Sequence, residues 1–275
     1  MSTGGHPSQP NSIQRGDMKI TVIGGTGLIG ARVVRQLRAS GHDVLVAARS
    51  TGVNSFTGEG LEDALTGADV LVDVSNSSYT DEAGAQEFFY TSTMNLLSYG
   101  EAAGVGHHVA LSVVGTDRLA RAEGGYFVAK QQQERLIIES HRPYSLVHAT
   151  QFFEFIRSIT DHAVRGGAVR VADVLVQPMA ADDVARAVVD TSLGQPLYGM
   201  VEFGGPEVFS LKDLAVMDLS FRQDEREVVP DPLGTYFGAR LASRDLLPEA
   251  TASIAQRRYH DWRIQTPEVV EDITA

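Results

Sequence analysis

The stretch "VIGGTGLIG", residues 22–30, places three glycines, Gly24, Gly27 and Gly30, directly after a short apolar run. The residues before the glycines are rich in β-branched side chains and predict a strand, whereas the residues after them repeat apolar side chains at helical spacing. Glycines in such a turn allow a tight bend and a close approach of the backbone to a bound anion. The stretch therefore predicts a turn that binds a pyrophosphate, with glycines kept only for packing as the alternative.

Strands and helices continue to alternate after this turn. Apolar runs predict strands over residues 41–50, 69–77, 107–115 and 144–150, and helical spacing predicts helices over residues 28–40, 60–68, 85–104 and 126–140. Such alternation is typical of a parallel sheet that helices cover on both faces, with right-handed crossovers. We therefore expect an α/β fold, a Rossmann-type doubly wound parallel sheet that binds a dinucleotide at its first turn.

The two ends of the chain depart from this alternation. Residues 1–17 are rich in Gly, Ser, Pro and Gln and predict a disordered tail, so the dinucleotide-binding core is expected over residues 18–150. Residues 151–275 alternate less regularly. We expect them to supply the remaining core elements and a small substrate-binding lobe over the edge of the sheet where the strands end.

Composition excludes several classes of chemistry. The chain of 275 residues has no cysteine, which rules out disulfides, thiolate nucleophiles and cysteine-bound metals, and its histidines lack metal-ligand spacing, so we expect no metal. The net charge of −12 and the dispersed basic residues argue against nucleic acid. No apolar run is long enough to span a membrane, and the polar first residues lack the apolar core expected of a secretory signal. A cytoplasmic protein with a small-molecule substrate is expected.

The end of the second predicted strand bears on which dinucleotide binds. NAD-binding sheets usually carry an acidic residue there, which hydrogen-bonds the ribose 2′-hydroxyl. Here the stretch reads "AARS", with Arg49 and Ser50 in that place. A guanidinium pairs with a 2′-phosphate, which an acid would repel. The sequence therefore predicts NADP(H), with a solvated arginine as the alternative.

The stretch "GGYFVAK", residues 124–130, holds a tyrosine and a lysine four residues apart. Residues at this spacing share one face of a helix, so Tyr126 and Lys130 can point into one cleft, where an ammonium favours ionisation of a phenol. Ser112 stands at the end of the preceding strand, at the edge where ligands bind. Together they predict a catalytic set, although Tyr126 alone could be a half-buried aromatic residue and Ser112 a turn residue.

With these motifs and the later segments "QFFEF", "QPMAADDVARAV" and "GGPEVFSLKDL", residues 18 to about 210 resemble the short-chain dehydrogenase/reductase superfamily, and more closely its atypical, NmrA-like branch. The resemblance implies that Tyr126 is the general acid, that Ser112 hydrogen-bonds the substrate oxygen, and that Lys130 binds the nicotinamide ribose and tunes the tyrosine. The residues expected to contact NADP(H) are Gly24, Gly25, Thr26, Gly27, Leu28, Ile29, Gly30, Arg49, Ser50, Val74, Ser75, Asn76 and Lys130.

One position departs from the pattern of that superfamily. Many members have an asparagine that supports a proton relay six residues before "NLL", and here that position is Phe89, while Asn95 belongs to "NLL" itself. The intact serine, tyrosine and lysine favour an NADPH-dependent reductase of a carbonyl or quinone-like group on a small apolar or aromatic substrate. The alternatives are a non-catalytic NADP(H)-binding redox sensor, and an epimerase or dehydratase on the same fold.

Two later segments allow more than one interpretation. Phe152, Phe153 and Phe155 in "QFFEF" could line an apolar substrate pocket over the nicotinamide, or could belong to a plain core helix. Asp182 and Asp183 could act as a pair of carboxylates. An aspartate directly before an apolar-periodic helix is more typical of an N-cap, and we expect that role.

Overall fold

The computed structural model describes residues 17–79, 81–122 and 125–266, so the predicted tail lies outside the described residues except for Asp17. Seven strands form one parallel sheet in the order β12-β9-β5-β4-β3-β1-β2. The strands are β1 (Lys19–Ile23), β2 (Asp43–Ala47), β3 (Val70–Asp73), β4 (His107–Val113), β5 (Tyr144–Ala149), β9 (Gly199–Gly204) and β12 (Ser253–Ile254). Because β1 lies between β2 and β3, the strand order reverses there, and the turn after β1 lies at the switch point where open sheets bind ligands.

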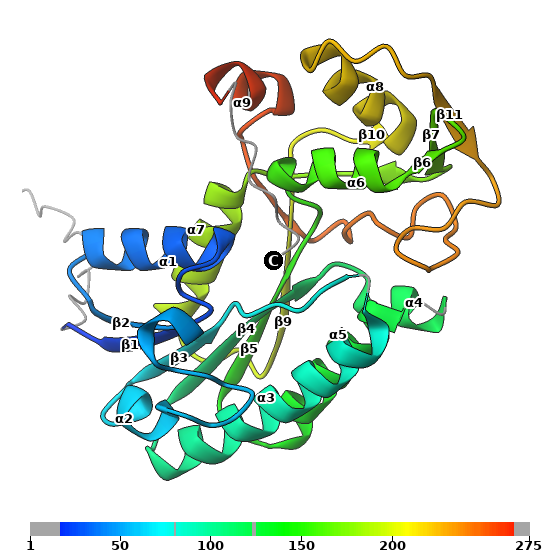
Figure 1. Ribbon diagram of the computed structural model, residues 1–275. Coiled ribbons are helices and arrows are strands. Elements are labelled where there is room, and N and C mark those ends of the chain that lie inside the picture. The colour runs from blue at the N-terminus through cyan, green and yellow to red at the C-terminus, as the bar shows by residue number, and fades with distance from the viewer. Residues whose placement is uncertain (1–16, 80, 123–124, 267–275) are drawn as a thin grey trace, which may run out of the picture.

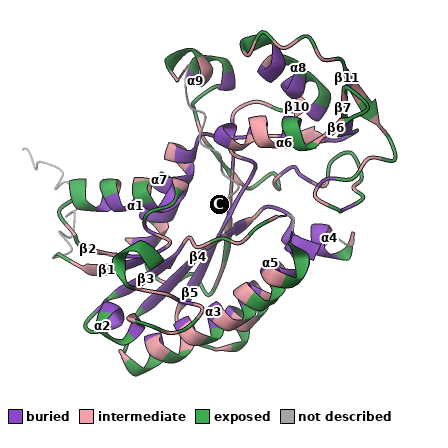
Figure 2. Ribbon diagram, viewed as in Figure 1, coloured by how far each residue is buried: buried purple, intermediate pink, exposed green. Residues whose placement is uncertain are grey.

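Helices cover both faces of this sheet (Figure 1). One face carries α1 (Leu28–Ala39) and α7 (Ala181–Ser192), and the other carries α2 (Leu61–Leu65), α3 (Glu82–Ala102) and α5 (Gly125–Glu139). The central strands β1, β3, β4 and β5 are largely buried (Figure 2), because a parallel sheet packs apolar side chains on both sides. The predicted Rossmann-type α/β fold is confirmed.

A lobe built mostly from the last third of the chain lies beyond the carboxyl ends of the central strands (Figure 1). It contains a three-stranded sheet, a two-stranded sheet and three helices. Its elements are α6 (Ile156–His162), β6 (Val164–Arg165), β7 (Ala168–Ala172), β8 (Leu175–Val176), β10 (Phe209–Ser210), α8 (Leu211–Phe221), β11 (Val228–Asp231) and α9 (Tyr259–Gln265). One cluster of buried apolar side chains runs from the first turns of α3 and α5 into this lobe. Across the described ranges, no helix is both long and apolar enough to cross a membrane.

Two local features differ from the expectations. A short helix, α4 (Thr116–Arg121), follows β4 and was not predicted. The expected N-cap role of Asp182 and Asp183 is wrong, because α7 is capped at Ala180 and both aspartates lie in its first turn. The carboxylate of Glu154 instead accepts a hydrogen bond from Ala181 N at 2.9 Å.

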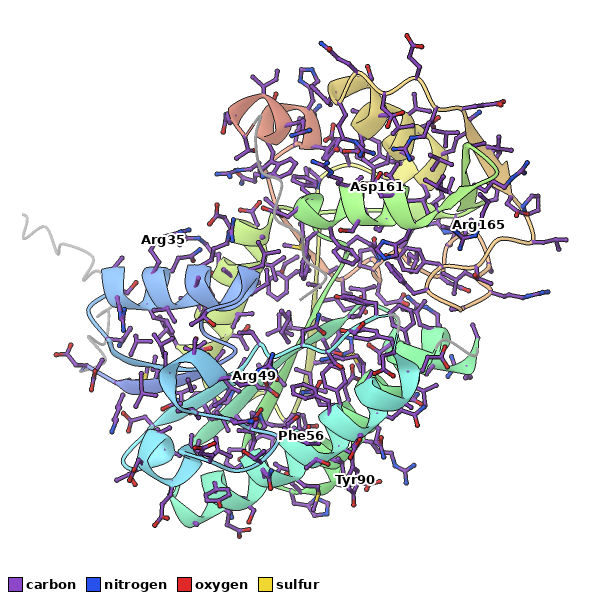
Figure 3. The ribbon with its side chains drawn as sticks, viewed as in Figure 1. Arg35, Arg49, Phe56, Tyr90, Asp161 and Arg165 are labelled. Carbon is purple, nitrogen blue, oxygen red and sulfur yellow. The ribbon has the colours of Figure 1, made fainter. Side chains whose placement is uncertain are left out.

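Asp182 is engaged elsewhere. Its carboxylate accepts a hydrogen bond from Arg35 of α1 at 2.5 Å, and Figure 3 labels Arg35 on that helix. An acidic side chain in the first turn still stabilises a helix through the helix dipole. Asp182 therefore serves the packing of α1 against α7.

Candidate active site at the carboxyl edge of the sheet

The glycines of the first turn differ in how close a Cβ atom, if added to them, would lie to neighbouring atoms. Gly24 has a φ of +76°, and a Cβ there would lie 2.9 Å from the Cα of Ser75. A Cβ on Gly30 would overlap the carbonyl oxygen of Gly24. A Cβ on Gly27 would meet only that same oxygen, at 3.4 Å, and Gly27 is exposed. Gly24 and Gly30 are therefore required for packing, whereas Gly27 presents open backbone.

This open backbone fits a bound anion. Helix α1 begins directly after Gly27, no described side chain caps it, and its first turn holds no acidic residue. The first N–H groups of a helix lack partners within the helix and carry partial positive charge. A pyrophosphate would satisfy them, and nothing acidic in the first turn of the helix opposes it.

Arg49 and Ser50 lie just beyond β2, in the short 3-10 turn η1 (Arg49–Thr51). Figure 3 labels Arg49. The turn is fixed by Thr51, whose hydroxyl donates to the carbonyl oxygen of Val46 at 2.9 Å. Both Arg49 and Ser50 are exposed, and Arg49 forms no ion pair within the part of the chain that the structure describes. Because β2 adjoins β1 in the sheet, this cation lies on the same edge as the glycine turn.

Tyr126 in the first turn of α5 is buried, with 3% of its surface exposed. Its hydroxyl donates to Oδ1 of Asn76 at 2.7 Å. The rings of Phe89 and Phe127 contact it edge-on, with centroids at 5.8 Å and 5.4 Å. Burial, with a smaller contribution from the neighbouring Tyr79, raises the pKa of Tyr126 well above its usual value of 10. This phenol therefore stays protonated at neutral pH, and the expectation that the ammonium of Lys130 favours its ionised form is wrong.

Lys130 shares the helix with Tyr126 but directs its ammonium to other partners. Its Nζ donates to the carbonyl oxygen of Leu111 at 2.8 Å and to Oε1 of Gln133. The same nitrogen lies 4.6 Å from the ring centroid of Phe89. Burial lowers the pKa of Lys130 to about 8, against the opposing charges of Asp73 and Glu134. Phe89, which stands where the resemblance implies an asparagine, thus lies against the lysine.

A chain of buried hydrogen bonds continues from Lys130 to the loop after β3. Gln133 Nε2 donates to Oδ2 of Asp73 at 2.9 Å. The other oxygen of Asp73 accepts from the backbone N and the hydroxyl of Ser75, at 3.0 Å and 2.6 Å. Gln133 was not predicted as a site residue, although its spacing of three from Lys130 places both side chains on one helical face. Lys130 is therefore connected to the loop that also holds Asn76.

Ser112 belongs to a second network. Its hydroxyl donates to Glu134 Oε1, and His148 Nε2 lies 3.2 Å from that same oxygen. Burial alone would raise the pKa of Glu134, but His148, Ser112 and Lys130 outweigh it and hold the pKa below its usual value. No pattern in the sequence singled out Glu134 or His148 as a site residue. Across residues 17–79, 81–122 and 125–266, no group of three or more acidic or histidine side chains could hold a metal ion.

The three phenylalanine side chains of "QFFEF" pack in different parts of the molecule. Phe152 pairs through its backbone with Met179 and packs with the cluster under α1 and α7. Phe153 lies in the lobe, with its ring centroid 5.3 Å from Tyr259. Phe155 reaches the aromatic residues around Tyr126. Substrate contact by these side chains stays a prediction, and Phe155 is the one placed near the phenol.

One loop joins the glycine turn to the tyrosine. The Cα atom of Ser75 lies where a side chain on Gly24 would point, and the next residue, Asn76, accepts the hydrogen bond from Tyr126. The register of the sheet brings these parts together, because Ile23 at the end of β1 pairs with Asp73 at the end of β3. The predicted cofactor residues Val74, Ser75 and Asn76 therefore lie between the turn and the phenol.

Known proteins match this core. Residues 20–151 match the NAD dependent epimerase/dehydratase family. The matched stretch runs from β1 to just past β5, so it contains the glycine turn, Ser112, Tyr126 and Lys130. The photosystem II assembly factor Ycf39 of Synechocystis sp. is 24% identical over 151 residues, which is 50% of this chain and 46% of that protein. The chain thus spans about half the length of this curated relative.

Two solved structures share the fold. A nucleoside-diphosphate-sugar epimerase from Staphylococcus aureus has a TM-score of 0.65 and 16% identity, over 94% of this chain and 98% of that chain. The UDP-glucose 4-epimerase of Thermus thermophilus in complex with NAD has a TM-score of 0.63 and 16% identity, over 84% and 90%. At such identities the likeness is one of fold.

Proposed function

We propose that the protein is an NADP(H)-dependent oxidoreductase of the short-chain dehydrogenase/reductase type, related to the NmrA-like branch. It reduces a carbonyl or quinone-like group on a small apolar or aromatic substrate. The observation that carries the proposal is the single loop that joins the glycine turn to Tyr126 through Ser75 and Asn76. The match to a nicotinamide-dependent family over residues 20–151 supports the cofactor class.

The turn and the strand ends would hold the cofactor. Gly27 and the first N–H groups of α1 would bind the pyrophosphate, and Arg49 would pair with the 2′-phosphate. Arg49 supports the phosphorylated dinucleotide because its guanidinium is exposed and has no acidic partner among the described residues. Val74 and Ser75 would border the nicotinamide half.

Tyr126 would supply the proton of the reaction. The dinucleotide held by these residues would supply a hydride, to the carbonyl carbon where the substrate is a ketone. The phenol of Tyr126 then protonates the carbonyl oxygen and regains its proton from water, and its raised pKa keeps it protonated at neutral pH. Ser112 would hydrogen-bond the same oxygen after turning away from Glu134. The buried ammonium of Lys130 would add positive charge near the developing oxyanion.

Two other functions each have an observation in their favour. A non-catalytic NADP(H)-binding regulator is supported by the burial of Tyr126 and by the relative that is an assembly factor. An epimerase or dehydratase is supported by the family model. A regulator would bind NADPH without consuming it, and an epimerase or dehydratase would convert its substrate with no net oxidation of the nucleotide.

Initial rates of NADPH oxidation with a panel of aryl ketones and quinones test the proposal. Tyr126→Phe removes one hydroxyl and keeps the ring, so it should leave NADPH affinity unchanged and lower turnover by about 10² to 10⁴, the usual contribution of general acid catalysis. Tyr90→Phe is the matched control, because Tyr90 is 47% exposed on α3 (Figure 3). Equal turnover in the wild type and Tyr126→Phe would exclude the role of Tyr126.

A further inference from the structure

The side chain of Tyr79 fills a space whose walls come from three separate parts of the chain. Its ring centroid lies 4.2 Å from that of Tyr126, 4.9 Å from that of Phe155 and 5.2 Å from that of Phe237. We name these three rings the aromatic cage. The planes are tilted by 35° to 41° relative to Tyr79, and tilted or offset contacts at such distances attract aromatic rings. The cage is therefore shaped for a flat ring.

An uncommon backbone conformation holds Phe237 in this cage. The backbone N of Tyr236 donates to the oxygen of Ala239 at 2.9 Å, and the N of Ala239 donates back at 3.0 Å. Phe237 and Gly238 are thus the tip of a tight hairpin, and both have positive φ, 47° and 86°. The first position of such a turn favours asparagine, aspartate or glycine, because a bulky side chain is strained there. Ring contacts in the cage account for a phenylalanine at this position.

The cage has one polar corner. The hydroxyl of Tyr126 donates to Asn76 there. Burial raises the pKa of Tyr79, and hydrogen bonds to Tyr126 and Asn76 offset part of that rise. The phenol oxygen of Tyr79 therefore lies beside the same hydroxyl that would protonate a substrate.

We propose that the aromatic cage is the substrate subsite, that it takes a planar six-membered ring bearing an oxygen, as in a quinone or a phenol, and that Tyr79 occupies it until such a ring displaces it. The inference rests on the proposed function for the role of Tyr126. The side chain of Tyr79 has the same shape as this ligand, because it is a planar six-membered ring whose oxygen lies in the plane of the ring. An entering ring takes the same aromatic contacts and places its oxygen beside Tyr126 and Asn76.

The position of Tyr79 in the chain allows this exchange. Strand β3 ends at Asp73 and α3 begins at Glu82, so Tyr79 lies on a connecting loop and not in a helix or strand. The loop is packed on the glycine turn at Ser75, two residues after the last pair between β1 and β3. Movement of residues 77–79, beyond Asn76, frees the cage without breaking a strand pair. It also frees the hydroxyl of Tyr126, which Tyr79 covers.

Binding of p-cresol, the side-chain analogue of tyrosine, tests the subsite without nucleotide or turnover. In the wild type Tyr79 competes for the cage, so Tyr79→Ala should bind p-cresol at least tenfold more tightly by calorimetry. Tyr90→Ala, which removes an exposed tyrosine, should bind it as the wild type does. The saturated analogue 4-methylcyclohexanol should bind Tyr79→Ala at least tenfold more weakly than p-cresol. Adding Tyr126→Phe to Tyr79→Ala should weaken p-cresol binding about threefold, since one hydrogen bond is lost.

Equal affinity of p-cresol for the wild type and Tyr79→Ala would overturn the inference, and so would equal affinity for the planar and the saturated ring. If Tyr79→Ala does not fold, Tyr79→Leu keeps apolar volume and should still bind p-cresol more tightly than the wild type. Tightened p-cresol binding in a protein that binds no NADPH would overturn the proposed function and support the subsite. Turnover of ketones with unchanged p-cresol affinity would overturn the subsite and support the function.

Discussion

Arg49 is the side chain expected to choose between NADPH and NADH. A charge-assisted contact with the 2′-phosphate contributes about 1.5 to 3 kcal/mol, so NADPH should bind more tightly than NADH and Arg49→Glu should remove that preference. The control is Arg165→Glu, since Arg165 is an exposed arginine on β6 in the lobe (Figure 3). Dissociation constants from titration of each variant with both dinucleotides check the prediction. Equal constants in the wild type would contradict it.

Lys130 gives the protein a predictable dependence on pH. Its pKa is about 8 in the folded chain and about 10.4 when unfolded, so the unfolded state binds more protons between these values. The free energy of unfolding should therefore rise with pH through this window, by about 1 kcal/mol per pH unit, relative to Lys130→Met. Denaturant titrations of both proteins at several pH values measure this difference. Parallel pH curves would show that Lys130 has an ordinary pKa.

At the scale of single residues, the sequence identified the candidate catalytic side chains better than the side chains that hold them in place. Tyr126, Lys130 and Ser112 were singled out from spacing, and the structure places all three near the carboxyl edge of the sheet. Their partners could not be predicted, because they depend on how the strands pair. His148 lies next to Ser112 only because β4 and β5 adjoin in register. The burial of Tyr126 likewise depends on the lobe and the loop that cover it.

The glycine turn provides a matched pair of substitutions at the scale of one element. Gly27→Ala adds a methyl group that meets no atom closer than 3.4 Å, at a φ of −77° that alanine adopts freely. It should therefore leave the thermal midpoint nearly unchanged and weaken NADPH binding at least tenfold, because the methyl group projects where the pyrophosphate would lie.

Gly30→Ala should behave in the opposite way. Its methyl group would overlap the backbone oxygen of Gly24, so the turn must shift, and we expect a loss of several kcal/mol in stability, as for other overpacked sites. Thermal unfolding and NADPH titration of both variants separate the two roles. A Gly27→Ala protein that binds NADPH as tightly as the wild type would contradict the pyrophosphate site.

Elements with a clear period were predicted, whereas several short ones were not, such as α4 and the two-residue strands of the lobe. The predicted helix over residues 28–40 corresponds to α1 (Leu28–Ala39), because four buried apolar side chains repeat along it. The six residues of α4 are too few to show a helical period, and its start follows from the φ of +74° at Gly115. Strands β8 and β10 of the lobe have only two residues each, so their pairing depends on tertiary packing.

At the scale of the whole molecule, the lobe and the core are expected to unfold together. One apolar cluster contains Phe89 and Tyr126 of the core and Phe153 and Trp262 of the lobe, so separation would expose all of them. Trp262 is the only tryptophan, and its fluorescence should follow the same denaturant curve as the far-UV circular dichroism.

The substitution Phe153→Ala sharpens this test. It removes a buried ring that packs on Tyr259 and Trp262, and should lower the stability seen by both signals by about 3 to 5 kcal/mol. A fluorescence transition that precedes the circular dichroism transition would show that the lobe unfolds by itself.

The proposed activity is tested most directly by the stoichiometry of a single turnover. Wild-type protein is mixed with one equivalent of NADPH and an excess of each member of the panel of aryl ketones and quinones, and both products are quantified. We predict that, for at least one acceptor, one NADP⁺ forms for each molecule reduced, and that Tyr126→Phe slows this step. Conversion of a substrate with all NADPH intact, or bound NADPH that no acceptor oxidises, would contradict reduction as the function.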